Sequence, residues 1–160
     1  MSGIRPIHYK LSMEPDLERF QFVGTAEIAL ETGLAVQEIV LNVLDLIVTA
    51  CWVRRAEALL PCVLSSDLNK EELNIRLPEA INGQFVLVVN YHGQINDSMA
   101  GFYRSSYVHQ GSRRFVAITQ FQESDARRAF PCLYHPSQKA TFDIEIIVVA
   151  GLSAVSYAAV

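Results

Sequence analysis

Apolar and polar residues alternate with a period of two along most of the chain. Alternation of this kind places one face of a strand on a core and the other face toward water. It therefore predicts an all-β fold in which each row of apolar side chains, the single tryptophan included, lies in the core. The rows are Tyr9, Leu11 and Met13; Ala26, Ile28 and Leu30; Leu46, Val48, Ala50 and Trp52; Leu73, Ile75 and Leu77; and Phe85, Leu87, Val89 and Tyr91.

Residues typical of turns separate these rows. They are EPD at 14–16, ETG at 31–33, SSD at 65–67, NG at 82–83 and ND at 96–97. Asparagine, aspartate, serine, proline and glycine favour turns because they tolerate or stabilise tight backbone conformations. The Asn-Gly pair stands between two predicted strands, so we expect a β-hairpin there.

Two segments depart from simple alternation. Residues 144–149 are apolar on both faces, as expected of an interior strand or of one that a partner covers. Residues 124–130 are the one helical candidate: Ser124 is placed to cap it, Asp125 falls in its first turn, and Pro131 ends it. We predict one domain over residues 1–160, a β-sandwich or saddle of mostly antiparallel strands with one short helical turn.

Composition limits the classes of partner and compartment. The chain has 160 residues, of which 51% are hydrophobic, which leaves room for a buried interface beyond the core. A net charge of −4 argues against nucleic acid and against an anionic membrane as partners. Three cysteines make an odd number without metal-ligand spacing, and neither a signal peptide nor a membrane-spanning run is present. We expect a reduced, cytoplasmic protein.

The motifs of hydrolytic and nucleotide chemistry are missing from the sequence. The four histidines are too far apart to form a zinc motif, which needs two of them one helical turn apart. The chain also lacks a phosphate-binding glycine loop and a Gly-x-Ser-x-Gly nucleophile elbow. We therefore expect no metal, no cofactor and no peptidase activity of the chain by itself.

Three blocks carry a family resemblance. They are PIHYKL at residues 6–11, which leads into residues 14–18 and 20–24; GQINDSMAGFYRSSY at 93–107; and TQFQESDARRAFPC at 119–132, followed by KATFDI at 139–144. Together they resemble the N-terminal domain of zinc aminopeptidases of the puromycin-sensitive type, a family that includes aminopeptidase N and leukotriene hydrolase. The resemblance implies a saddle-like β-sandwich that packs, in the full enzymes, on a thermolysin-like catalytic domain.

The chain departs from the family pattern in ways that bear on function. It ends before the family's Gly-x-Met-Glu-Asn strip and zinc motif, and its small, apolar residues 150–160 favour a naturally shortened, stand-alone descendant. The family usually has Gln-x-Glu where this chain has Gln120 and Gln122, although the leukotriene-hydrolase branch also carries glutamine. That glutamate helps to hold the substrate's amino terminus, and a neutral amide loses the ionic part of the contact. Where relatives read Cys-x-Asp-Glu-Pro, two acids are replaced by Tyr134 and His135.

The candidate ligand contacts follow from the resemblance. Gln120 and Gln122 would line the family's substrate cleft and orient a ligand, or they are inherited strand residues with nothing to bind. Tyr103 and Arg104 belong to a family-like loop, in which they bind a ligand or serve packing.

The candidate catalytic residues are Tyr134, His135 and Asp125. A histidine beside a tyrosine could run metal-free acid–base chemistry, with the aspartate as an additional base. The alternatives are sequence drift for the Tyr-His pair and a helix-terminal role for Asp125. Arg127 and Arg128 match the family and are expected to form structural salt bridges, and Cys132 is expected to be a core thiol.

Three functions remain open from the sequence. The first is a non-peptidase module that binds a small molecule or peptide through the former cleft face, or that forms a homodimer. The second is a small isomerase or cyclase without metal or cofactor. The third is the recognition domain of an aminopeptidase, assembled with a separate catalytic chain.

Overall fold

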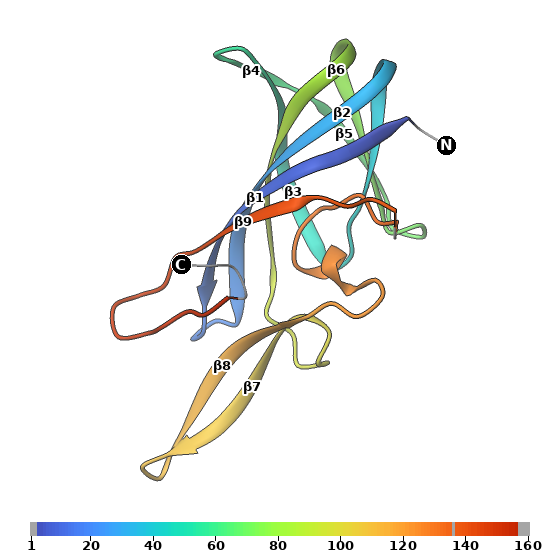
Figure 1. The fold of residues 1–160 in the computed structure, drawn as a ribbon. Coiled ribbons are helices and arrows are strands. Elements are labelled where there is room, and N and C mark those ends of the chain that lie inside the picture. The colour runs from blue at the N-terminus through green and yellow to red at the C-terminus, as the bar shows by residue number, and fades with distance from the viewer. Residues whose placement is uncertain (1–2, 136, 157–160) are drawn as a thin grey trace.

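The computed structural model describes residues 3–135 and 137–156 and confirms the all-β prediction (Figure 1). The described residues form nine strands and one short 3₁₀ helix, η1. The strands are β1 (Ile4–Asp16), β2 (Gln21–Asn42), β3 (Leu46–Arg55), β4 (Ala58–Pro61), β5 (Val63–Asp67), β6 (Glu72–Gln94), β7 (Gly101–His109), β8 (Ser112–Gln120) and β9 (Thr141–Ile146), and η1 spans Asp125–Arg128.

Seven of the strands form one sheet, and β7 and β8 form a separate ribbon. The order in the sheet is β4-β3-β6-β2-β1-β9, and β5 pairs with the first half of β6. All pairings are antiparallel except that of β1 with β9, which is parallel. Figure 1 shows the β7–β8 ribbon projecting away from the sheet. None of the described helical residues belongs to a helix that is long and apolar enough to cross a membrane.

The two longest strands, β2 and β6, run through both layers of the sandwich. Residues 21–32 of β2 pair with residues 83–94 of β6, and residues 36–42 of β2 pair with residues 72–81, with a register shift between the two blocks. Thr32 lies opposite Gly83, whose φ of 89° lets the backbone change direction without breaking the strand. The hairpin predicted at 82–83 and the turn predicted at 31–33 are therefore wrong, because the two turn-like segments face each other and bend a continuous pair of strands.

One core lies between the layers. Four of the five predicted rows are buried, and the buried residues of both halves of β2 and β6 form one cluster. The exception is the row in β3, where a register shift between Val48 and Ala50 reverses which residues face inward. Cys51 and Val53 are buried, and Trp52 is only half-buried on the other face. The prediction of a core tryptophan is therefore wrong.

Strand β9 forms an edge of the sheet. Its outer edge pairs with no strand of the described chain. Phe142 and Ile144 are each 43% exposed, and the strand ends at Ile146. The prediction of an interior strand over residues 144–149 is therefore wrong. Cover of these residues by a partner stays a prediction.

The predicted helical turn is present but shorter than expected. It covers Asp125–Arg128, with Asp125 in the first turn, and Ser124 precedes it without a side-chain capping hydrogen bond. The capping role of Ser124 is therefore wrong.

Candidate functional site

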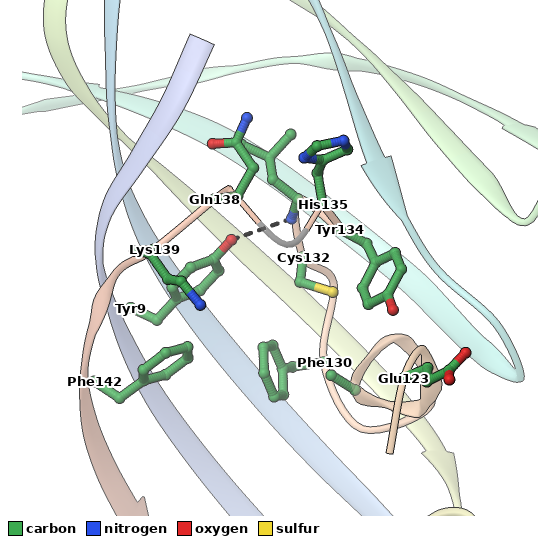
Figure 2. Close-up of a pocket in the computed structure, with 11 residues that line it drawn as sticks. Tyr9, Glu123, Phe130, Cys132, Tyr134, His135, Gln138, Lys139 and Phe142 are labelled. Atoms are coloured by element: carbon green, nitrogen blue, oxygen red, sulfur yellow. Dashed lines mark hydrogen bonds between the residues drawn. The ribbon is translucent and has the colours of Figure 1, made fainter. Parts of the chain in front are cut away.

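A hollow of about 490 Å³ lies where β1, η1 and the segment that leads into β9 meet. Figure 2 shows its side chains, which come from parts of the chain that are far apart in the sequence. The lining residues are Tyr9, Glu123, Ala126, Phe130, Cys132, Leu133, Tyr134, His135, Gln138, Lys139 and Phe142.

Aromatic rings form one wall of the hollow. The parallel register of β1 and β9 sets Tyr9 beside Phe142, and the two rings stack with their centroids 5.0 Å apart. Phe130 meets both rings edge-on, at centroid distances of 5.9 Å from Tyr9 and 6.1 Å from Phe142. Offset and edge-to-face arrangements of this kind are favourable beyond the burial of apolar area.

The segment after η1 is fixed from two sides. The backbone N–H of Leu133 donates to the Tyr9 hydroxyl at 3.1 Å. Asn42 and Cys132 exchange backbone hydrogen bonds of 2.7 and 3.2 Å, and the Asn42 side-chain oxygen accepts from the backbone N–H of Tyr134 at 3.1 Å. Burial raises the pKa of the Tyr9 hydroxyl above its ordinary value and raises the pKa of the Cys132 thiol to about 12. Both groups stay protonated at neutral pH, and Cys132 is a buried core thiol as predicted.

Two arginines anchor η1, which confirms the predicted salt bridges. The Arg127 guanidinium donates to Glu71 at 3.0 Å and lies 4.6 Å from the centroid of the Tyr134 ring. Arg128 donates to Asp125 at 3.0 Å and pairs with Asp45, the residue before β3. These contacts hold the turn, and the residues on either side of it, against the sheet.

The structure brings two of the three candidate catalytic residues together. Tyr134 and His135 both line the hollow, although they are adjacent in the chain. His135 Nδ1 lies 2.8 Å from the Ser137 hydroxyl. Asp125 is not part of the lining and is engaged with Arg128. Acid–base chemistry by these residues stays a prediction.

The candidate ligand contacts fall in two places. Gln120 and Tyr103 lie on the same face of the β7–β8 ribbon, because Tyr103 pairs with Ile118 and strand side chains alternate between faces. Gln122 follows two residues after Gln120 and is also exposed. Arg104 lies on the opposite face of the ribbon, where it stacks on the Phe20 ring at 4.4 Å and donates to the Ile95 carbonyl at 2.6 Å. A ligand role for any of the four stays a prediction.

Sequence reasoning missed the aromatic wall and Lys139. The only local signal was the apolar alternation around Tyr9, which indicates a strand but does not reveal its neighbour. Within residues 3–135 and 137–156, no group of three or more His, Cys, Asp or Glu side chains is placed to hold a metal ion. Binding of a small molecule or peptide through the former cleft face and pairing of two copies stay predictions.

The sequence is similar to plant and yeast aminopeptidases over nearly its whole length. It is 38% identical over 152 residues to Aminopeptidase M1-D of Oryza sativa subsp. japonica and 39% identical over 159 residues to Aminopeptidase M1 of Arabidopsis thaliana. It is 33% identical over 156 residues to mitochondrial Aminopeptidase 2 of Saccharomyces cerevisiae. These matches cover 94%, 94% and 91% of this chain, but only 17%, 18% and 16% of the relatives.

The chain therefore spans about a sixth of the length of the curated relatives that it matches. Residues 5–159 match the family described as the Peptidase M1 N-terminal domain. The match extends over the β-sandwich, the ribbon and the segment that forms the hollow. The chain belongs to the Peptidase M1 N-terminal domain family.

Proposed function

We propose that this chain is the non-catalytic recognition domain of an aminopeptidase. One face of the β7–β8 ribbon docks on a catalytic chain, and Gln120 and Gln122 contact the amino end of a bound peptide. The observation that carries the proposal is an exposed apolar stripe on the ribbon that ends at Gln120.

The stripe, which we call the ribbon face, occupies one side of both strands. Its apolar members are Tyr103, Tyr107, Val116 and Ile118, and Ser105, Arg114 and Gln120 lie on the same side. Tyr107, Val116 and Ile118 are 53%, 39% and 37% exposed. An isolated two-stranded ribbon is only marginally stable in water, and a contiguous apolar surface is typical of an interaction site.

The opposite face of the ribbon is already packed. Phe115 meets Phe20 edge-on at 4.9 Å, and Arg104 stacks on the same Phe20 ring. The ribbon is thus held to the sandwich by one face and leaves the ribbon face free for a partner. This arrangement favours docking in a fixed orientation.

The comparisons suggest what the partner is. More than four fifths of each plant relative lies outside the region that matches this chain, and those relatives are named aminopeptidases. The catalytic part that the family resemblance implies belongs to that remainder. A catalytic aminopeptidase chain is therefore the occupant that we assign to the ribbon face.

The polar end of the ribbon suits recognition of an amino terminus. The amide oxygens of Gln120 and Gln122 can accept hydrogen bonds from an ammonium group. Gln122 has a φ of 39°, a left-handed conformation that is unfavourable for a residue with a side chain. Conformations of this kind concentrate at binding sites, where the surrounding structure maintains them. Here the anchored turn η1 follows directly.

The docking step can be tested by complementation. The remainder of Arabidopsis Aminopeptidase M1, without its matched segment, is purified and mixed with this chain, and its own segment serves as the positive control. We expect a complex in size-exclusion chromatography and faster hydrolysis of alanine 4-nitroanilide. Ile118→Asp should abolish both, whereas Ile47→Asp, which changes a 61% exposed isoleucine on β3, should leave both intact.

The recognition step has a separate readout. Gln120→Ala and Gln122→Ala should raise KM in the complex about ten- to hundredfold with kcat little changed, since a hydrogen bond to a charged group contributes about 1.5–3 kcal/mol. An unchanged KM in both variants would refute the peptide contact. A complex that tolerates Ile118→Asp would refute the docking face.

A further inference from the structure

Two cysteines lie side by side where the chain crosses from one layer of the sandwich to the other. Cys51 is in β3, and Cys62 is the residue between β4 and β5. Trp52 pairs with Pro61 in the β3–β4 ladder, so Cys51 and Cys62 form the next pair along. The backbone N–H of Cys62 donates to the Cys51 carbonyl at 2.9 Å, which confirms that the pairing continues.

The two thiols lie on the same face of this strand pair. Cys51 and Val53 are buried in the core, and their cross-strand neighbours Cys62 and Leu60 pack against the same core. Hydrogen-bonded neighbours in an antiparallel ladder have Cα atoms about 5.5 Å apart, and disulfides span Cα distances of about 4.4–6.8 Å. This pairing therefore puts the two Cα atoms within the range that a disulfide spans, and both cysteines are free.

The environments of the two thiols differ in a way that assigns their roles. The neighbouring Cys51 thiol lowers the pKa of the half-buried Cys62 thiol. The same contact, together with burial, raises the pKa of the Cys51 thiol, which is 3% exposed. Thiolate character and access decide which cysteine reacts first. Because Cys62 is half-buried and Cys51 is only 3% exposed, a small disulfide reaches Cys62 first, so Cys62 is the attacking group and Cys51 is the partner that resolves the intermediate.

We infer that Cys51 and Cys62 are a redox-active pair that closes to an intramolecular disulfide when the chain meets a small-molecule disulfide. The Cys62 thiolate attacks one sulfur of the small disulfide, which forms a mixed disulfide and releases one thiolate. The Cys51 sulfur then loses its proton to solvent, attacks Cys62 Sγ, closes the bridge and expels the second small thiolate, and solvent protonates both released thiolates. The two protein thiols are oxidised and the small disulfide is reduced to two thiols, so atoms and electrons balance.

The disulfide would hold the segment in which the chain passes from one layer of the sandwich to the other. Cys62 follows β4, which pairs with β3, and it precedes β5, which pairs with the first half of β6. A bond from Cys62 to β3 fixes the start of β5 relative to the other layer. Oxidation should therefore raise the thermal midpoint of unfolding, and reduction should reverse the rise.

The whole chain is incubated with oxidised glutathione at mildly alkaline pH, and the reaction is quenched with acid. Intact mass and peptide mapping then identify the adducts and disulfides. We expect the wild type to lose two hydrogen atoms and to keep one thiol that reacts in denaturant. Cys51→Ala should stop at a stable glutathione adduct on Cys62. Cys62→Ser should form neither adduct nor bridge, and Cys132→Ala should form the bridge as the wild type does.

Three results would overturn the inference. The first is a wild type that keeps all three thiols after exposure to oxidised glutathione. The second is a bridge that joins Cys62 to Cys132 or joins two chains. The third is a Cys62→Ser variant that gains the same oxidation-dependent rise in thermal midpoint as the wild type, a readout that does not depend on whether Cys51→Ala folds.

Discussion

Two buried tyrosines offer a sharp test of how the hollow is held together. Tyr9 and Tyr91 are each 3% exposed. The Tyr9 hydroxyl accepts the backbone N–H of Leu133 at 3.1 Å, whereas the Tyr91 hydroxyl has no hydrogen-bond partner among the residues that the structure describes. Tyr9→Phe and Tyr91→Phe remove the same oxygen atom, and we expect opposite effects on stability.

The expected magnitudes follow from the partners. Tyr9→Phe leaves the N–H of the partly buried Leu133 unpaired, which should lower the free energy of unfolding by about 1 kcal/mol. Tyr91→Phe removes an unpaired buried hydroxyl, whose desolvation is uncompensated, and should raise that free energy by about 1 kcal/mol. The two variants should therefore differ by about 2 kcal/mol, or about 30-fold in the unfolding equilibrium constant.

Urea unfolding followed by the fluorescence of Trp52, the one tryptophan, measures both variants. The slope of the transition should match the wild type, so that the shift in midpoint reports stability alone. If Tyr91→Phe is destabilised as much as Tyr9→Phe, the reasoning fails, because the Tyr91 hydroxyl must then be hydrogen-bonded in solution.

Two further predictions concern charge. Burial raises the pKa of Tyr9 and of Tyr91 above that of an exposed tyrosine, so above about pH 10 the unfolded chain releases protons that the folded chain retains. The free energy of unfolding should then fall as pH rises above about 10. Urea midpoints that stay constant as pH rises above this value would contradict the prediction. Arg127→Met breaks the ion pair of a side chain that is only 12% exposed, leaves Glu71 unpaired, and should lower the free energy of unfolding by about 2 kcal/mol. Arg114→Met, at an exposed position with no salt bridge in the described chain, is the control for the same urea assay, and equal losses in both would refute the anchoring role.

The alternation of apolar residues predicted the fold class because it depends only on local strand geometry. A side chain two positions along a strand returns to the same face, whatever the strand pairs with. The family resemblance added the sandwich, which the structure and the family match confirm. Both signals are carried by short stretches of sequence.

Predictions that depended on pairing were less accurate. Residues 31–33 and 82–83 have turn chemistry, but in the structure the two segments face each other and bend two paired strands without reversing either. The misplaced Trp52 has a similar cause: a register shift before Ala50 exchanges the inner and outer faces, and nothing in the alternation before it signals the change.

The candidate site was predictable only in part for the same reason. The unusual Tyr134 and His135 drew attention to the correct segment, since a departure from a family pattern is visible in one sequence. Tyr9 and Phe142 become neighbours through a parallel pairing between strands at opposite ends of the chain. The turn and loop signals between them do not specify that pairing.

The parallel pairing of β1 with β9 also fixes an order of events during synthesis. Of the described strands, β1 is the first to leave the ribosome and β9 is the last. Until β9 emerges, the edge of β1 that it will cover presents unpaired backbone groups, and the Tyr9 ring lacks its stacking partner Phe142. The sheet is therefore complete only once residues 141–146 have left the ribosome, and until then a chaperone or a neighbouring nascent chain meets an open β1 edge.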